Sequence, residues 1–265
     1  MFHDIIVIGG GAAGIASAIA SKDMGKDTAI LEGSDRIGKK LLATGNGRCN
    51  ISNTDIDPDR YHSENPSFPK NILDRFGYSE ALDFFSLFGL PLATLEGGKV
   101  YPMSLQASSA LDIFRLALDE RGIPVYLDSK VKEIKTSKEG FRLLTTSGEV
   151  FECSRLIICC GGKSFPVSGS DGSGFTLAKH LGHSIIKPIP SLVQLKLRYD
   201  HLKAVSGVKF DGYARIVSAE GESQAEFGEI LFTDYGISGP PILQLSRKAS
   251  YALSRHEDVH IIVDM

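Results

Sequence analysis

The sequence lacks the features that mark several large classes of protein. Its 265 residues contain only four cysteines, which form no CxxC pair and no cluster with histidine at a spacing typical of metal ligands. No stretch reaches the roughly 18 consecutive apolar residues that a membrane-spanning helix needs. We therefore expect no disulfide framework, no bound metal ion and no membrane-embedded segment.

A large excess of charge of one sign is also absent. The formal net charge is −3 at pH 7 and the isoelectric point is near 6.2, which does not indicate a polyanionic partner. We expect a small-molecule substrate, no nucleic acid and no membrane as partners, and the oligomeric state stays open. The apolar residues 5–20 lack the basic start of a signal peptide. Together with the few cysteines, this favours a cytoplasmic, reducing location.

The chain does contain a strand–turn–helix–strand pattern at its start. Residues 5–8 are an apolar run typical of a buried parallel strand. After a glycine-rich turn, small and apolar residues recur at helical spacing through Met24, and Gly25 is placed to end that helix. Residues 28–32 form the second strand. Because such a crossover joins parallel strands, we expect a parallel sheet with helices on its faces.

Later segments extend this α/β pattern. We expect amphipathic helices near 70–89 and 105–121, a β-meander made by 124–127, 131–135, 141–145 and 150–153, a buried strand at 156–160 and a helix near 172–181. From about residue 190, strands at 192–197, 214–218, 228–233 and 260–264 indicate a separate β-rich module. The predicted domains are therefore 1–190 and 191–265.

The turn after the first strand carries the spacing GxGxxG. Gly9 permits a tight turn, Gly11 lets the backbone approach a pyrophosphate, and Gly14 lets the helix pack closely on the strand. The helix N-terminus then offers free N–H groups to the phosphates. Glu32 ends the second strand, where it can accept hydrogen bonds from ribose hydroxyls. This combination predicts a dinucleotide site rather than a glycine-rich turn without a ligand.

The loop at residues 38–53 bears on which dinucleotide is bound. An acid such as Glu32 suits the adenosine ribose of either FAD or NAD. The loop is rich in glycine and asparagine and contains Arg48, so its N–H groups and this cation suit a pyrophosphate or the edge of a flavin ring. A loop that could wrap the rest of an extended cofactor favours FAD. The alternative is that residues 38–53 form a solvated surface loop without a ligand.

Four segments carry a resemblance to a known family. Residues 38–53 match the pattern GxKxLxTGNGRCNxTN with Ser52 in place of threonine, and residues 161–166, 169–174 and 231–241 match further motifs. On these motifs the chain resembles the bacterial NAD(P)/FAD-dependent oxidoreductases of the aminoacetone oxidase family. In that family the position of Asp234 is often histidine and that of Pro241 often alanine, so no role is carried onto these two residues.

The resemblance implies a glutathione-reductase-like fold, in which a Rossmann-like FAD-binding domain with a parallel sheet and β-meander is interrupted by a β-barrel-like insert. Family members also have a C-terminal return segment that completes the flavin side. We expect this segment to be absent here, which puts complete flavin binding and catalysis by this chain in question. The resemblance further implies cofactor contacts from three groups of residues. They are Gly9, Gly11, Ala13, Gly14 and Glu32 for the ADP half; Lys40, Thr44, Gly45, Asn46, Arg48, Cys49 and Asn50 for the flavin side; and Val131 for adenine, with Gly161 and Gly162 passing close to the cofactor.

The expected activity is that of an FAD-dependent oxidoreductase. Such an enzyme would oxidise a small amine such as aminoacetone or reduce a small carbonyl or enone compound. The alternatives are an NAD(P)H-dependent flavin reductase and a non-catalytic FAD-binding fragment or partner-docking flavoprotein. Dithiol chemistry is not expected, because Cys49 has no cysteine within a few residues. No second GxGxxG turn is present, so NAD(P)H would bind only transiently. The scattered histidines give no catalytic base, and the catalytic residues stay unassigned.

Overall fold

The computed structural model describes residues 1–62, 65 and 67–265. The chain divides into two compact units, Met1–Ile185 and Ile186–Met265. The sequence-based division lay five residues later, between 190 and 191.

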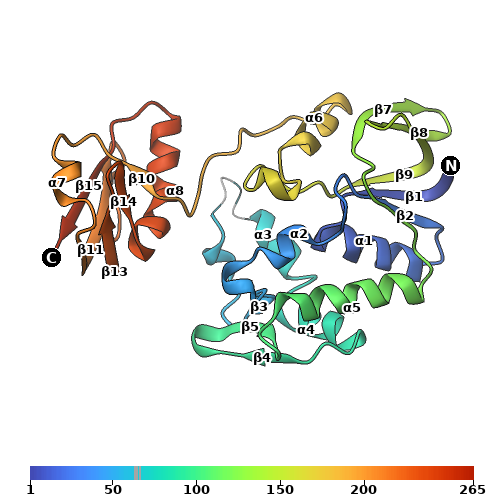
Figure 1. Ribbon diagram of the computed structural model, residues 1–265, viewed down its shortest axis with the longest axis horizontal. Helices are drawn as coiled ribbons and strands as arrows, with labels where there is room; N and C mark the ends of the chain where they lie inside the picture. The colour runs from blue at the N-terminus through green and yellow to red at the C-terminus, as the bar shows by residue number, and fades with distance from the viewer. Residues whose placement is uncertain (63–64, 66) are drawn as a thin grey trace. The chain divides into compact units, whose positions relative to one another are not determined.

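The first unit is built on a six-stranded sheet with the order β6-β2-β1-β9-β8-β7 (Figure 1). The strands β6, β2, β1 and β9 run parallel, and β7, β8 and β9 form an antiparallel meander at one edge. The predicted Rossmann-like α/β fold with a central parallel sheet is confirmed. The strands are β1 (Phe2–Ile8), β2 (Thr28–Leu31), β6 (Val125–Tyr126), β7 (Val131–Ser137), β8 (Gly140–Thr145) and β9 (Val150–Ile158).

Both faces of this sheet pack into cores, which explains why residues 5–8 of β1 are apolar. Val7 packs into a core with α1 (Ala12–Asp23) and α5 (Ala107–Glu120), both predicted from helical periodicity. Ile6 and Ile8 face the other core, with the meander and α6 (Ser173–His180). Gly25 follows α1 with φ of +78°, as expected for a residue that ends a helix.

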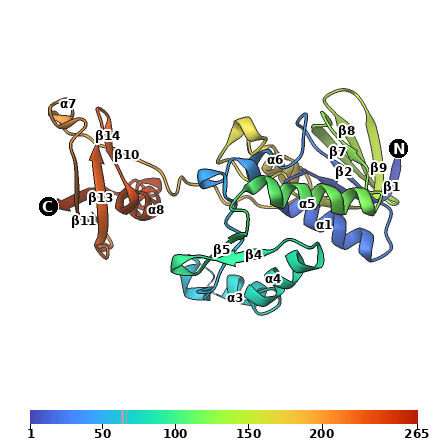
Figure 2. The same cartoon turned by 60° about the horizontal axis from the view of Figure 1, so that its bottom comes forward.

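A three-stranded antiparallel sheet with the order β3-β5-β4 lies beside two helices in the same unit (Figure 2). Its strands are β3 (Ser52–Asn53), β4 (Leu92–Thr94) and β5 (Lys99–Pro102), accompanied by α3 (Ser67–Leu73), α4 (Tyr78–Leu87) and short 3-10 helices at Pro58–Arg60 and Glu96–Gly98. The single helix predicted near 70–89 is wrong. Helix α3 ends at Leu73, and Gly77 is the N-cap of α4, whose Glu80 side chain accepts a hydrogen bond from the Gly77 N–H at 2.9 Å.

Two strand predictions also need correction. The strands predicted at 150–153 and 156–160 are one strand, β9, which ends at Ile158, because the polar residues between them stay in extended pairing with β1. Residues 124–127 do not belong to the meander. Their strand, β6, pairs in parallel with β2 at the opposite edge of the sheet.

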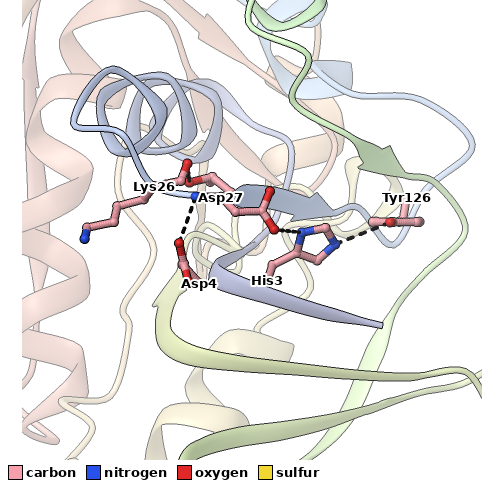
Figure 3. A network of polar contacts seen from close by, with 6 residues as sticks. His3, Asp4, Lys26, Asp27 and Tyr126 are labelled. Carbon is pink, nitrogen blue, oxygen red and sulfur yellow. Dashed lines mark hydrogen bonds and ion pairs between the residues drawn. The ribbon is translucent and has the colours of Figure 1, made fainter.

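The start of the parallel strands is tied together by a small polar network (Figure 3). His3 on β1 contacts the Asp27 carboxylate through Nδ1 at 2.9 Å and the Tyr126 hydroxyl through Nε2 at 3.4 Å. The Asp27 N–H donates to Asp4 at 3.1 Å. These contacts link the start of β1 to the residue before β2 and to the Tyr126 side chain of β6.

The second unit is an antiparallel sheet with the order β10-β14-β13-β11-β12, in which β15 also pairs with β11. This sheet corresponds to the predicted β-rich module. Its elements are β10 (Leu195–Lys196), α7 (Leu202–Val205), β11 (Lys209–Ser218), β12 (Gly221–Glu222), β13 (Glu226–Phe232), β14 (Gly236–Ser238), α8 (Pro240–Ser254) and β15 (His260–Asp264). Helix α8, which no sequence prediction included, packs Ile242, Leu245 and Ala249 against β11 and β13. In the described residues of both units, no helix is long and apolar enough to cross a membrane.

Candidate dinucleotide-binding site

A cleft of about 720 Å³ lies at the carboxyl ends of β1, β2 and β9, within the first unit. In open α/β sheets this is where ligands bind, and the volume falls in the range of small-molecule sites. The lining comes from segments that are distant in sequence: residues 8–13, 31–34, 36, 38–41, 44, 129–131, 158–161, 166–171, 173 and 177. The loops after three neighbouring strands therefore meet at one site.

Two glycines of the first turn are required by close packing within the protein. Gly9 has φ of +106°, and a Cβ there would lie 2.5 Å from the Cys159 carbonyl oxygen. A Cβ at Gly14 would overlap the carbonyl oxygen of Gly9. Gly9 thus lets β1 turn beside the end of β9, and Gly14 lets α1 pack on that turn. Gly14 itself lies behind the cleft surface.

Gly11 has a different environment. A Cβ at this position would meet no protein atom within 4 Å, and Gly11 and Ala13 both line the cleft. Gly11 is the N-cap of α1, which has no side-chain cap and no acidic residue in its first turn. Its backbone N–H groups and the positive end of the helix dipole therefore remain available to an anion such as a pyrophosphate.

Glu32 lies in the cleft directly after β2. Its Oε2 accepts a hydrogen bond from the Gly10 N–H at 2.7 Å, and its Oε1 accepts one from the Ser34 N–H at 2.8 Å. These contacts hold the carboxylate against the glycine turn. Since a carboxylate has about four acceptor positions, Glu32 retains capacity for ribose hydroxyls. The geometry fits the predicted role.

Four cationic side chains line the cleft, and two of them are neutralised by carboxylates. Lys39 pairs with Asp35 at 2.6 Å, and Lys130 pairs with Asp171 at 2.6 Å. Lys40 donates to the uncharged Ser164 hydroxyl at 2.7 Å. Within the described part of the chain, neither Lys40 nor Arg36 forms an ion pair with a carboxylate. Lys40 and Arg36 are therefore the lining cations that remain available to an anionic ligand.

Asp171 is strongly held in its ionised form. A hydrogen bond from the Lys130 ammonium group, followed by those from the Ser173 hydroxyl and N–H, keeps the pKa of Asp171 well below its usual value. The Ser173 N–H contact, at 2.9 Å, also caps the start of α6. A single carboxylate thus joins the loop before β7 to the start of α6.

The predicted adenine side is closely packed. Val131 lines the cleft and is only 4% exposed. The preceding residues form a short ladder with the loop after β2: the Ser129 N–H donates to the Glu32 carbonyl at 2.8 Å, and the Asp128 N–H donates to the Ser34 carbonyl at 2.9 Å. This ladder brings Val131 and Glu32 to the same end of the cleft.

The predicted flavin-side residues divide into two groups. Lys40 on α2 (Lys39–Leu42) and Thr44 line the cleft. The others lie outside the lining: Gly45, Asn46, Arg48, Cys49 and Asn50. Their contacts with a cofactor stay a prediction.

Cys49 in particular is buried among apolar side chains. It is 6% exposed, packs with Leu90, Ala107 and Ala110, and has φ of +59°. Burial raises the pKa of its thiol. Its N–H donates to the Thr44 hydroxyl at 3.0 Å, which closes the turn around the 3-10 helix Gly45–Gly47. A structural thiol is the interpretation that this environment favours.

At the end of β9, Gly161 lines the cleft with φ of +72°, whereas Gly162 lies outside the lining. Cys159 and Cys160 precede them and point into different layers. The Cys159 Sγ is 3.9 Å from the Ser17 hydroxyl on α1, and the Cys160 Sγ is 3.8 Å from the Ile8 carbonyl. Burial, with smaller contributions from neighbouring negative charges, raises the pKa of Cys160 to about 11. These thiols are therefore protonated at neutral pH.

Sequence reasoning missed several cleft residues, chiefly Ser34, Arg36, Ser129, Lys130 and Asp171. Asp171 lies within a quoted motif, and Lys130 directly precedes Val131, so both positions had a local signal. Nothing in the sequence indicated that the two residues pair, because 41 residues separate them in the chain.

Sequence comparison relates the chain to known proteins. Residues 3–239 match the family of the HI0933-like protein Rossmann domain. The chain is 40% identical over 260 residues to the 3-dehydro-bile acid delta(4,6)-reductase of Clostridium scindens, with 97% of this chain and 63% of that protein covered. It is 29% identical over 250 residues to the ribosomal RNA dihydrouridine synthase of Haemophilus influenzae, with 92% of this chain and 61% of that protein covered. The chain thus spans about three fifths of the length of these curated relatives.

Two solved structures share the fold. The 3-ketosteroid-delta4-(5alpha)-dehydrogenase of Rhodococcus jostii, in complex with 4-androstene-3,17-dione, superposes with a TM-score of 0.53 at 13% identity, covering 69% of this chain and 55% of that one. The open conformation of a flavocytochrome c3 fumarate reductase gives a TM-score of 0.52 at 14% identity, covering 79% of this chain and 47% of that one. At such low identity the likeness concerns the fold alone.

Proposed function

The chain belongs to the HI0933-like Rossmann family, and on that premise we propose that it binds FAD in the cleft and acts as a flavin-dependent oxidoreductase that reduces a conjugated enone. The observation that carries the proposal is the open glycine cradle at Gly11 beside the carboxylate of Glu32. The first can receive a pyrophosphate and the second a ribose, at one end of one cleft.

The residues of this chain would bind and orient the cofactor. Gly11 and Ala13 would meet the pyrophosphate, Arg36 would balance its charge, Glu32 would hold the adenosine ribose, and Lys40 would lie at the flavin side. When bound, FAD supplies two-electron transfer chemistry. The two electrons and a proton would come from transiently bound NAD(P)H, a second proton from solvent, and a carbon–carbon double bond would be reduced.

The reductive direction is supported by the Clostridium scindens relative, which is 40% identical and whose name gives a 3-dehydro bile acid as substrate. A small-molecule substrate of the enone class, in a cytoplasmic enzyme, is therefore the favoured assignment. The ribosomal RNA relatives are more distant, at 29% identity, and the net charge of −3 does not favour an RNA partner.

Oxidation of a small amine such as aminoacetone is the second candidate. It is favoured by residues 38–53, which match the pattern of the aminoacetone oxidase family almost completely. A flavin reductase without an organic acceptor and a flavoprotein without turnover are further outcomes that the same experiment separates.

Anaerobic flavin spectroscopy tests these proposals. The protein is saturated with FAD and mixed with NADH or NADPH, and a 3-keto-4-ene steroid is then added. We expect the nucleotide to bleach the flavin absorbance and the enone to restore it, whereas the matched ketone without the double bond leaves it bleached. Bleaching by amines alone would establish the second candidate instead. Bleaching by NAD(P)H without recovery would indicate a flavin reductase, and failure to take up FAD would refute the proposal as a whole.

A further inference from the structure

Two loops that line the cleft are joined by one ion pair, although 41 residues separate its members. The Lys130 ammonium nitrogen lies 2.6 Å from Oδ2 of Asp171. Lys130 belongs to the loop before β7, and Asp171 to the loop before α6. Both side chains line the cleft, and their exposed fractions are 47% and 29%.

Each member of the pair is fixed by further contacts. The Lys130 carbonyl accepts a hydrogen bond from the Thr146 N–H at 2.8 Å. A Cβ at Gly33 would lie only 3.2 Å from the Lys130 Cβ, so Lys130 packs on the loop that follows Glu32. Asp171 uses its other oxygen to cap α6 through the Ser173 N–H. The pair thus connects the Glu32 loop to the start of α6.

We propose that Lys130 and Asp171 are positioning residues, which hold the loop at residues 166–171 against the adenosine end of the cleft and thereby set the affinity for the ADP half of a dinucleotide. This inference deepens the proposed FAD site and rests on it. Glu32 and Val131, the residues expected at the ribose and adenine, lie next to the lysine end of the pair. The pair therefore acts on the ADP half and leaves the flavin side, at Lys40 and Thr44, to other contacts.

The two members are not equivalent toward an anionic ligand. Removing Lys130 breaks the bridge and also leaves the Asp171 carboxylate unpaired in the cleft that would hold an anionic ligand. Removing the Asp171 charge breaks the bridge but leaves a free ammonium group in the cleft. Because like charges repel, the first change weakens ligand binding more than the second, and this difference shrinks at high salt.

The test measures dissociation constants for FAD and for ADP with the wild-type protein and three variants, Lys130→Ala, Asp171→Asn and the double variant. Asparagine keeps the shape of the side chain and its capacity to cap α6. Lys135→Ala is the matched control, because it removes a lysine that pairs with Glu133 at 3.4 Å on β7, outside the cleft.

We expect Lys130→Ala to weaken the affinity for FAD and the affinity for ADP by the same factor, about two- to fivefold, as for a partly exposed ion pair. Asp171→Asn has a smaller effect, the double variant recovers part of the loss, and Lys135→Ala has none. A Lys130→Ala variant that binds ADP like the Lys135→Ala control would overturn the inference. Wild-type protein that binds ADP but no FAD would refute the proposed cofactor while the inference still stood on ADP, and failure to bind either would refute both.

Discussion

Gly11 and Gly14 lie in the same turn, yet the structure predicts opposite consequences for replacing each by alanine. A methyl group at Gly14 would overlap the Gly9 carbonyl oxygen, which is a backbone atom and cannot rotate away. A methyl group at Gly11 meets no protein atom within 4 Å. The first substitution therefore disturbs the folded protein, and the second disturbs only what enters the cleft.

The free energies of unfolding follow from these environments. For Gly11→Ala, restriction of the unfolded chain gains about 0.4–1 kcal/mol. Alanine is a poorer N-cap than glycine by a similar amount, roughly 0.5–1 kcal/mol. The φ of −84° suits either residue, so the net change is close to zero. For Gly14→Ala, overpacking costs about 1–3 kcal/mol, of which the better helix propensity of alanine returns up to about 1 kcal/mol.

Urea denaturation followed by circular dichroism gives the stability, and quenching of FAD fluorescence gives the affinity. We expect Gly11→Ala to unfold within about 0.5 kcal/mol of wild type while its dissociation constant for FAD rises at least about tenfold, equivalent to 1.4 kcal/mol. We expect Gly14→Ala to lose about 1–2 kcal/mol of stability. Unchanged FAD affinity in Gly11→Ala would refute the assignment of this cradle to the pyrophosphate, and a fully stable Gly14→Ala would refute the packing argument.

Three further predictions concern ionisable side chains. Because the pKa of Asp171 is lowered, its ion pair stabilises the protein at pH values above the unfolded-state pKa of 3.8, and this contribution is lost as the pH falls below it. Asp171→Asn should therefore lower the free energy of unfolding by about 1 kcal/mol at pH 7, after screening, and leave it unchanged in strong acid, as measured by urea titration at each pH. Cys153, which is 1% exposed and whose pKa is raised to about 11, should react with iodoacetamide at pH 7.5 only after unfolding, and rapid labelling of Cys153 in the native protein would contradict its burial. His3→Ala should destabilise the protein by about 1 kcal/mol through loss of its Asp27 contact. If the stabilisation comes from the contact between these two side chains, adding His3→Ala to an Asp27→Ala variant should cause no further loss of stability.

The elements that the sequence predicted correctly are those whose signal is local. The start and end of α1 follow from the glycine turn and from Gly25, and β15 follows from a short apolar run. The break between α3 and α4 was missed because apolar residues continue at helical spacing across it. The second helix begins at the N-cap Gly77, a capping feature that the spacing of apolar residues does not reveal.

The candidate site divides in the same way. Gly9, Gly11 and Glu32 were identified because their roles depend on neighbours within a single βαβ unit. Lys130 and Asp171 were not identified, since their roles depend on the approach of two loops that only the folded sheet brings together. The loop at residues 38–53 has a specific pattern, but most of its members lie outside the cleft lining, because the turn buries Cys49 in the core beside α5.

In the proposed function, the cleft would recognise FAD mainly through backbone N–H groups and the spaces left by glycine, with Glu32 as the chief exception. Such a site constrains the fold strongly and says little about a substrate, which would meet the cofactor at its other end. This accounts for relatives that share the sequence family and yet are named for substrates as different as a bile acid and ribosomal RNA. On the proposed function we expect substrate choice to reside in residues outside this cleft, so that exchanging those residues between relatives exchanges the substrate while leaving FAD affinity unchanged.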